Sequence, residues 1–175
     1  AAVIALTATA TKHVIKDITE QLGFLGPKIF KSSFFRPNLS YHSMTIEDSK
    51  HKTISLLKKI KSSAIVYVRS RIETEQLATT LELQGISSGF YHGGMSFKKK
   101  EVMYSDWINN KFSVMVATNA FGMGIDKSDV EMVIHLTIPD SLEAYFQESG
   151  RAGRNGEKAF AYLITCLLYT SDAAD

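Results

Sequence analysis

Short apolar runs that alternate with amphipathic stretches are the feature that most constrains how this sequence can fold. Residues 64–68 are a continuous apolar run of the kind found in strands buried on both faces, and 114–118 and 132–136, apolar except for Thr118 and His135, are predicted to be buried strands as well. The stretches between them place apolar residues at helical spacing. Strands that alternate with helices predict an α/β domain with a mainly parallel sheet flanked by helices. Such sheets bind their ligands at the carboxyl ends of the strands, so we expect the functional residues there.

Weaker signals extend this pattern toward both ends of the chain. Residues 3–6 have the apolar character of a strand. The helix predicted after them is capped by the hydroxyl of Thr11 and ends at Gly23. Residues 26–46 are predicted to form a connector, which can include a short strand at 28–30. The remaining predictions are strands at 87–91 and 159–164 and a helix capped by Ser96.

The length, charge and cysteine count limit what this chain can be. Its 175 residues have room for one ordinary domain and a fragment of a second. The 20 basic and 18 acidic side chains leave a formal net charge of only +2, so affinity for nucleic acid has to come from local clusters. Cys166 is the only cysteine, which excludes an internal disulfide and argues against a cysteine-based zinc site. No apolar run approaches the roughly 20 residues of a membrane span, so no membrane partner is expected.

Two arginines stand among three glycines in the segment 147–156. A guanidinium offers five donors in a fixed plane and keeps its charge at any working pH. Arg151 and Arg154, three residues apart on a glycine-rich bend, therefore suit a polyphosphate. Surface arginines are more commonly solvated charges, but the spacing Q-x-x-G-R-x-G-R favours an anion site.

A second glycine-bearing segment follows a predicted buried strand. Thr118 offers a hydroxyl at the strand end, Gly122 and Gly124 allow close approach of a ligand, and Asp126 offers an acceptor for a ribose hydroxyl. A strand followed by G-x-G also invites comparison with the Rossmann dinucleotide fingerprint. That fingerprint requires Gly or Ala where Lys127 stands, so we reject a Rossmann site.

Two further strand ends carry residues that suit a nucleic-acid backbone. Arg69 and Ser70 come directly after the strand predicted at 64–68, where a helix start, a hydroxyl and a guanidinium can bind a phosphate. Ser70 as an ordinary helix cap is an equally good interpretation of the spacing. His92 and Gly93 follow the next predicted strand, although a lone histidine is most often structural.

These segments resemble one known family. The spacing Q-x-x-G-R-x-G-R looks like the last motif of superfamily 2 helicases, and residues 146–154, 119–127 and 36–39 are similar to RecQ-type DNA helicases in particular. The resemblance covers about residues 1–165 and implies a RecA-like, P-loop NTPase-type fold, that of a helicase C-terminal domain. The chain departs from the family at Gly93, where Ala is usual, so the match around His92 is weaker.

The resemblance also implies residue roles. Gln147, Arg151 and Arg154 are implied to be catalytic, with both arginines reaching the γ-phosphate of an ATP that sits on another RecA-like domain. The same three residues, with Gly124 and Asp126, are implied to bind ATP. Six residues are implied to bind nucleic acid: Arg69, Ser70, His92, Gly93, Thr118 and Asn119.

Two motifs that ATP hydrolysis requires do not occur in the sequence. There is no G-x-x-x-x-G-K-[ST] and no Asp-Glu-x-His, so no residue here is expected to hold Mg²⁺ or to position the attacking water. The expected cofactor is ATP with Mg²⁺, whose metal ligands we expect on the first RecA-like domain. We predict no metal site in this chain and no ATP hydrolysis by the chain alone.

The resemblance implies a domain organisation and a function. We interpret residues 1–35 as the end of a first RecA-like domain, 36–166 as a complete second one and 167–175 as an unassigned tail. Since the chain begins without Met inside an apolar run, we interpret it as a fragment. The implied parent is an ATP-dependent 3'–5' DNA helicase of DNA repair, recombination and replication, nuclear in a eukaryote and cytoplasmic, associated with the nucleoid, in a bacterium. Its expected partners are single-stranded or partly duplex DNA and the first RecA-like domain in cis.

Two alternatives remain open at the level of sequence. One is an RNA helicase of the same superfamily, because contacts to phosphates do not distinguish DNA from RNA. The other is a non-enzymatic module that binds nucleic acid, because the phosphate-binding loop is missing from these 175 residues.

Overall fold

The computed structural model describes residues 3–7, 11–31, 33, 35–122 and 125–166. The chain divides into two compact units, residues 1–37 and 38–175, and each is described by itself. In the first unit, helix α1 spans Lys12–Gln21, and the Thr11 hydroxyl caps it by accepting a hydrogen bond from the Val14 N–H, as predicted. That this unit ends another RecA-like domain stays a prediction.

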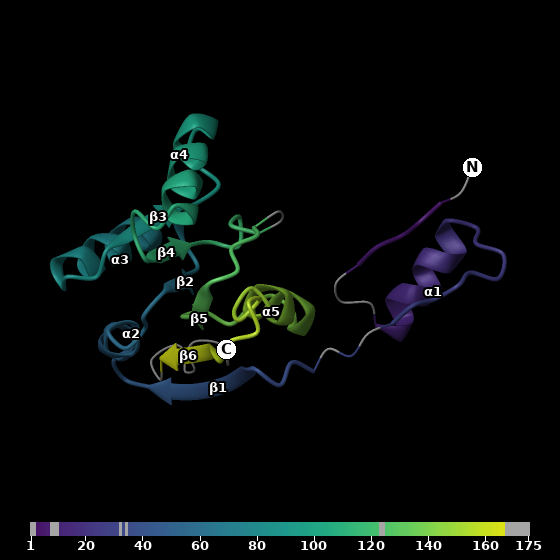
Figure 1. Cartoon of the computed structure of the whole chain (residues 1–175), viewed down its shortest axis with the longest axis horizontal. Coiled ribbons are helices and arrows are strands. Elements are labelled where there is room, and N and C mark those ends of the chain that lie inside the picture. The colour runs from purple at the N-terminus through teal and green to yellow at the C-terminus, as the bar shows by residue number, and fades with distance from the viewer. Residues whose placement is uncertain (1–2, 8–10, 32, 34, 123–124, 167–175) are drawn as a thin grey trace, which may run out of the picture. The chain divides into compact units, whose positions relative to one another are not determined.

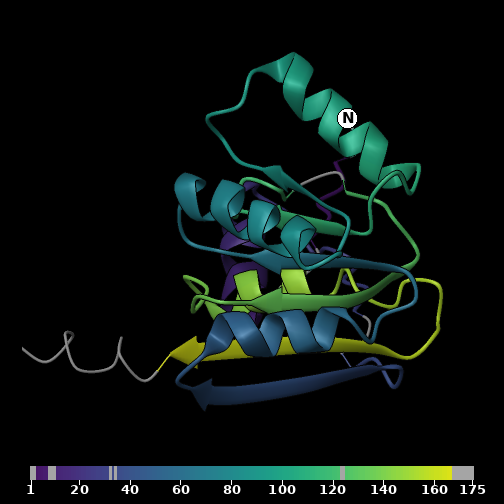
Figure 2. The same cartoon turned by 90° about the vertical axis from the view of Figure 1, so that its left-hand side faces the viewer.

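The second unit is built on one six-stranded sheet in which all neighbouring strands run parallel. The strand order is β1-β6-β5-β2-β4-β3, with β1 and β3 at the two edges (Figure 1). Because the strands are parallel, the loops that follow them lie at one end of the sheet, here called the carboxyl edge, toward which the arrows point in Figure 2. The strands are β1 (Leu39–Ile46), β2 (Ser63–Tyr67), β3 (Ser88–Tyr91), β4 (Val114–Ala117), β5 (Val130–His135) and β6 (Ala159–Cys166).

Helices cover both faces of this sheet. Helices α2 (Ser49–Leu57) and α3 (Arg71–Leu83) pack over one face, in front of the strands in Figure 2, while α4 (Phe97–Ile108) and α5 (Leu142–Ser149) belong to the other. Each face has its own apolar core, because successive side chains of a strand point to opposite faces. The predicted α/β fold with a parallel sheet flanked by helices is confirmed.

Three details of the predicted fold are wrong. Residues 39–46 were predicted to be part of a connector, but they form β1, which pairs with β6 from Leu39 opposite Ala159 to Ile46 opposite Cys166. Half of the eight residues of β1 are solvent-exposed, as in an edge strand, and polar residues interrupt its apolar ones, so it lacks the apolar run that identifies the inner strands. Residues 3–6 and 28–30 are not strands, and their apolar side chains, Leu6 for example, are exposed. An isolated segment has no neighbour for its backbone hydrogen bonds.

Candidate nucleotide and nucleic-acid site

Most of the predicted site residues come from the loops of the carboxyl edge, but the turn after α5 leads to the opposite end of the sheet, where its Gly153 N–H bonds to Val130 at the start of β5. The expectation that all functional residues lie at the carboxyl ends of the strands is therefore wrong for this turn. Three pairs follow successive neighbours in the sheet: Arg69 and Ser70 follow β2, Thr118 and Asn119 follow β4, and His92 and Gly93 follow β3. Asp126 lies between β4 and β5, Gln147 is an exposed residue of α5, and both arginines lie in the following turn. Gly124 lies outside the described residues. The roles of these residues stay predictions.

Arg151 is a buried arginine, with 5% of its surface exposed. Its guanidinium lies next to the glycine-bearing loop, since a Cβ added to Gly122 would be 4.0 Å from Arg151 Nη2. The Arg151 Nε is buried and has no hydrogen-bond partner among the described residues. Because a buried charge with an unused donor is costly, the Arg151 Nε has bonding capacity that an anion can take up.

Tyr67, at the end of β2, forms part of the wall around Arg151. Burial raises the pKa of Tyr67 above its ordinary value, the Arg151 cation lowers this pKa by less, and the Glu148 carboxylate adds to the rise. The phenol therefore remains protonated at any working pH. Its hydroxyl donates a hydrogen bond of 3.0 Å to the Phe121 carbonyl oxygen, which belongs to the same loop as Gly122.

Arg154 is held differently from Arg151. Its side chain is 36% exposed, and its Nη1 donates to the Ile125 carbonyl oxygen at 2.8 Å and to Asp126 Oδ1 at 3.0 Å. Asp126, which is 87% exposed, is therefore paired with one of the arginines with which it was predicted to share ATP. An ion pair this exposed is worth about 0–1 kcal/mol, so a phosphate can replace the carboxylate at little cost.

The turn that carries both arginines is fixed by contacts distant in sequence. The Asn38 Nδ2 donates to the Gly153 and Glu157 carbonyl oxygens, each at 2.8 Å, and the Gly153 N–H donates to the Val130 carbonyl oxygen at 2.8 Å. Asn38 was noted in the sequence only as part of a family resemblance. Its structural role could not be predicted, because no local pattern connects positions 115 residues apart.

Lys127 fixes the other end of the glycine-bearing loop. It is 6% exposed, and its Nζ contacts Asn110 Oδ1 at 2.7 Å, the Ile108 carbonyl oxygen at 3.3 Å and Asp129 Oδ1 at 3.0 Å. The ammonium also lies 5.3 Å from the centre of the Trp107 ring. In the sequence, Lys127 only excludes a Rossmann site, whereas in the structure it is an anchor between the loop and the end of α4.

Ser70 is engaged in capping α3. Its hydroxyl accepts from the Glu73 N–H at 3.2 Å, while the Ser70 N–H donates to Glu73 Oε2 at 2.9 Å, which together form a capping box. Arg69 and Arg71 are exposed on either side of it, and the Arg71 guanidinium lies over the turn after β3, where a Cβ on Gly94 would be 2.8 Å from Nη1. The cations are therefore better placed than the serine hydroxyl to meet a phosphate.

His92 is a buried histidine with both ring nitrogens engaged. Its Nδ1 accepts from the Gly94 N–H at 3.2 Å, so Nε2 carries the hydrogen and donates to Glu75 Oε1 at 3.0 Å. This arrangement shapes the turn and leaves Gly93 exposed on it. A Cβ on Gly93 would be 3.8 Å from the Ala120 Cβ, so the turns after β3 and β4 lie side by side.

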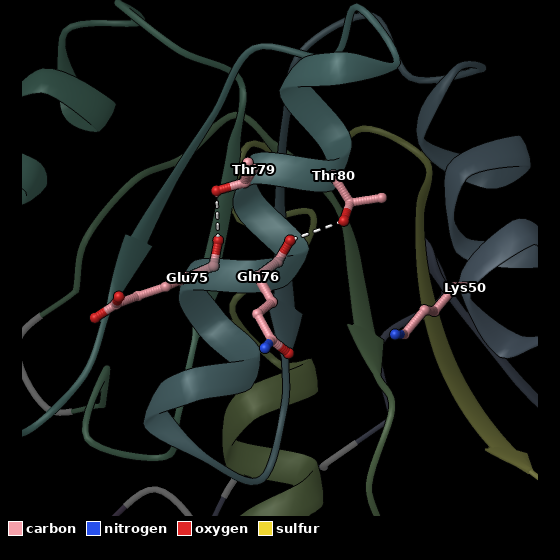
Figure 3. A pocket seen from close by; sticks show the side chains of 5 residues that line it. All are labelled: Lys50, Glu75, Gln76, Thr79 and Thr80. Atoms are coloured by element: carbon pink, nitrogen blue, oxygen red, sulfur yellow. Dashed lines mark hydrogen bonds between the residues drawn. The ribbon is translucent and has the colours of Figure 1, made fainter.

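Glu75 also lines a shallow depression of about 550 Å³ on the outer side of α3, shown in Figure 3. Its other lining residues are Lys50, Gln76, Thr79 and Thr80. The hydroxyls of Thr79 and Thr80 donate to the carbonyl oxygens of Glu75 and Gln76 within the helix (Figure 3). Since Lys50 comes from α2, the depression reaches from α3 to α2, and two of its five lining residues have their hydroxyls engaged within α3.

Within the described residues, no three His, Cys, Asp or Glu side chains are grouped so that they could hold a metal ion. No helix in this part of the chain combines the length and the apolar character that crossing a bilayer requires.

Comparison with known proteins identifies the family. The model of the helicase conserved C-terminal domain matches residues 48–156, which include every predicted site residue. The chain belongs to this helicase family. The predicted resemblance to RecQ-type helicases is confirmed as well: the RecQ-like DNA helicase blm-1 of Caenorhabditis elegans is 42% identical over 167 residues, or 93% of this chain and 17% of the worm protein.

Two further comparisons bear on the fold and the substrate. A putative ATP-dependent RNA helicase, R290 of Acanthamoeba polyphaga mimivirus, is 41% identical over 91% of this helicase chain and 30% of its own length. The chain thus spans less than a third of either relative. A solved chain of the E. coli DEAD-box protein SrmB has a similar structure, with a TM-score of 0.66 and 28% identity, and the match covers 72% of this chain and 76% of the solved SrmB chain.

Proposed function

We propose that the full-length protein is an ATP-dependent 3'–5' DNA helicase of the RecQ type and that residues 38–166 are its second RecA-like domain. The observation that carries this proposal is the pair of arginines beside the glycine-bearing loop, one buried with an unused donor and one exposed in a pair that exchanges easily. RecQ-like DNA helicases are prominent among the relatives, which supports DNA as the substrate.

The unused donor of Arg151 fits a nucleotide phosphate, and Arg154 and Asp126 are paired between the neighbouring turn and loop, while Gln147 is an exposed residue of α5, the helix that leads into the turn. When bound, ATP supplies the phosphoryl group, and its Mg²⁺ neutralises part of the charge. On this chain, Arg151 binds and orients the phosphates. Arg154 exchanges Asp126 for a phosphate, which frees the Asp126 carboxylate to accept a ribose hydroxyl. Arginines supplied in this way typically accelerate phosphoryl transfer by about 10³ to 10⁵.

The nucleic-acid strand would follow the turns after β2, β4 and β3. Arg69 and Asn119 are exposed there and can contact phosphates, while Gly93 lets the backbone approach. Ser70 and His92 would act by shaping the turns that present these groups. Contacts of this kind bind a strand of any sequence, as a translocating motor requires.

Arg154→Ala in the full-length enzyme tests the nucleotide half of the proposal. We expect ATP turnover to fall by about 10³-fold or more, with single-stranded DNA binding unchanged. Lys158→Ala is the matched control, because it removes an exposed cation four residues further on, beside Phe160, and should leave both measurements unchanged. Unchanged ATPase activity in Arg154→Ala would rule out this role for the arginine.

The substrate is tested by measuring how single-stranded DNA and RNA of the same length and sequence stimulate the ATPase, each alone and in competition. The viral relative named as an RNA helicase makes RNA the second candidate. We expect DNA to stimulate the ATPase at lower concentration than RNA. A preference for RNA would favour the other helicase class of the superfamily, and stimulation by neither would favour a non-enzymatic binding module.

A further inference from the structure

A continuous series of buried contacts leads from the glycine-bearing loop to α5, the helix that precedes Arg151. It begins at Tyr67, which is 2% exposed and donates its hydroxyl to the Phe121 carbonyl oxygen. The Tyr67 ring stacks on the His135 ring, with centroids 4.9 Å apart and planes at 18°. The two residues are paired in register on β2 and β5, so the sheet itself holds the stack.

His135 connects Tyr67 to α5 through a hydrogen bond to Glu148. Its Nε2 lies 2.7 Å from Glu148 Oε2, and because a carboxylate only accepts hydrogen bonds, Nε2 carries the hydrogen. This pair is almost completely buried, with 1% of the histidine side chain and 12% of the glutamate side chain exposed. The Glu148 carbonyl oxygen then accepts from the Arg151 N–H at 3.2 Å. One end of the series is therefore the loop and the other end is the arginine turn.

Tyr67 and His135 are too deeply buried to contact a substrate, so any effect they have must act through their neighbours. The neighbours differ in their predicted ligands. The loop begins with two residues that are expected to meet the nucleic-acid strand, Thr118 and Asn119, and continues to two that are expected to meet ATP, Gly124 and Asp126. Arg151 is expected to meet ATP only. Close-packed interiors transmit displacements because they have no free volume to absorb them.

We propose that Tyr67 is a positioning residue that couples the glycine-bearing loop to Arg151, so that binding of a nucleic-acid strand to the start of this loop positions the Arg151 guanidinium for ATP hydrolysis. This inference rests on the proposed function. The Tyr67 hydroxyl holds the loop through the Phe121 carbonyl, and the ring holds His135 and, through it, Glu148 at the base of the arginine turn. Removal of the hydroxyl takes away the bond to the Phe121 carbonyl and the direct interaction of the phenol oxygen with the Arg151 cation, and it leaves the ring stack in place.

The test is Tyr67→Phe in the full-length enzyme, with the ATPase rate measured against the concentration of single-stranded DNA. We expect the ratio of the rate at saturating DNA to the rate without DNA to fall about fivefold, which corresponds to about 1 kcal/mol. The DNA concentration for half-maximal stimulation should stay unchanged, because Tyr67 does not contact the strand.

Two further substitutions separate coupling from structure. Tyr162→Phe makes the same chemical change on β6, against the core of the opposite face, and should keep the wild-type ratio. Glu148→Ala should lower the ratio as Tyr67→Phe does. Glu148→Gln should restore most of it, because the amide oxygen still accepts from His135.

The outcomes distinguish this inference from the proposed function. If the wild-type enzyme is not stimulated by DNA, the proposed function fails and this inference fails with it. If the wild type is stimulated and Tyr67→Phe keeps its ratio, or lowers both rates by the same factor, the inference alone is overturned. Should Tyr67→Phe not fold, as shown by its melting curve, the comparison of Glu148→Gln with Glu148→Ala decides the question.

Discussion

At the scale of single residues, Gly153 shows why the arginine turn needs a glycine at one position and only prefers it at another. Gly153 has a φ of +66°, and a Cβ there would lie 2.6 Å from Asn38 Nδ2 and 2.8 Å from the Ala159 Cβ. Gly156 also has a positive φ, +85°, but a Cβ there would meet nothing within 4 Å. Gly153 is therefore required both by its positive φ and by the lack of space for a Cβ, whereas Gly156 is favoured by its positive φ alone.

We predict that Gly153→Ala destabilises the chain more than Gly156→Ala does. A non-glycine residue at positive φ costs about 1–2 kcal/mol, which both variants incur. The Gly153 variant also pushes against Asn38 and weakens its two hydrogen bonds, which adds about 1–3 kcal/mol. Urea denaturation of the purified chain would measure the difference, and equal losses would show that Asn38 does not constrain the turn.

The buried phenol of Tyr67 leads to a second prediction, which concerns the stability of the folded chain at alkaline pH. Burial raises the Tyr67 pKa in the folded chain above the ordinary value of 10.0. Below that value, tyrosine is neutral in both the folded and the unfolded chain, and stability does not depend on it. As the pH rises through about 10, the unfolded chain releases this proton and the folded chain keeps it, so stability falls by up to about 1.4 kcal/mol per pH unit.

Comparison of wild type with Tyr67→Phe isolates this effect. Other tyrosines and the lysines titrate in both proteins, so their contributions largely cancel in the difference. Urea denaturation at a series of pH values from about 9 to about 11 should show a steeper decline for the wild type. Parallel declines would mean that the Tyr67 pKa is not raised by the fold.

At the scale of elements, the helices at the carboxyl edge are fixed by different caps. Ser70 and Glu73 form a reciprocal capping box at α3. Ser96 caps α4 through one hydrogen bond of 3.4 Å from the Lys99 N–H. The start of α3, next to Arg69, should therefore be held more rigidly by its cap than the start of α4.

We predict that Ser70→Ala lowers the free energy of unfolding by about 1–2 kcal/mol and that Ser96→Ala lowers it by about 0.5 kcal/mol. Chemical denaturation of the two variants would measure both values. In the full-length enzyme, Ser70→Ala should weaken single-stranded DNA binding less than Arg69→Ala, because the serine hydroxyl is occupied by the cap. A larger loss of binding in Ser70→Ala would indicate a direct contact.

At the scale of the whole molecule, one unit contains the entire sheet. All six strands and both apolar cores lie between residues 38 and 166. Each strand has its neighbours within that range, so its backbone hydrogen bonds do not depend on residues 1–37.

A shortened chain of residues 38–166 should therefore fold cooperatively. We predict a melting temperature within a few degrees of that of the 175-residue chain, measured by circular dichroism. The Arg154–Asp126 pair would be present in the shortened chain, since both residues lie within it. Loss of a cooperative transition would show that the first unit contributes to the stability of the sheet.

The sequence by itself determined the fold class, the strands β2 to β6 and the positions of the segments that are expected to bind ligands. Apolar runs, helical spacing and capping residues are local patterns, so each can be recognised within a single segment of the sequence. The exposed edge strand β1 lacks such a pattern, and only its pairing with β6 identifies it.

Only the tertiary structure decided how the site is held. Arg151 and Arg154 look alike in the sequence, yet one is buried beside Tyr67 and the other is exposed with Asp126. Ser70 and His92, which are predicted to bind nucleic acid, also hydrogen-bond to Glu73 and Glu75, and the hydrogen bonds of Asn38 to distant residues have no signal in the sequence. The physical reason is that burial and hydrogen bonding depend on which side chains the folded chain brings together, and spacing along the chain does not record those contacts.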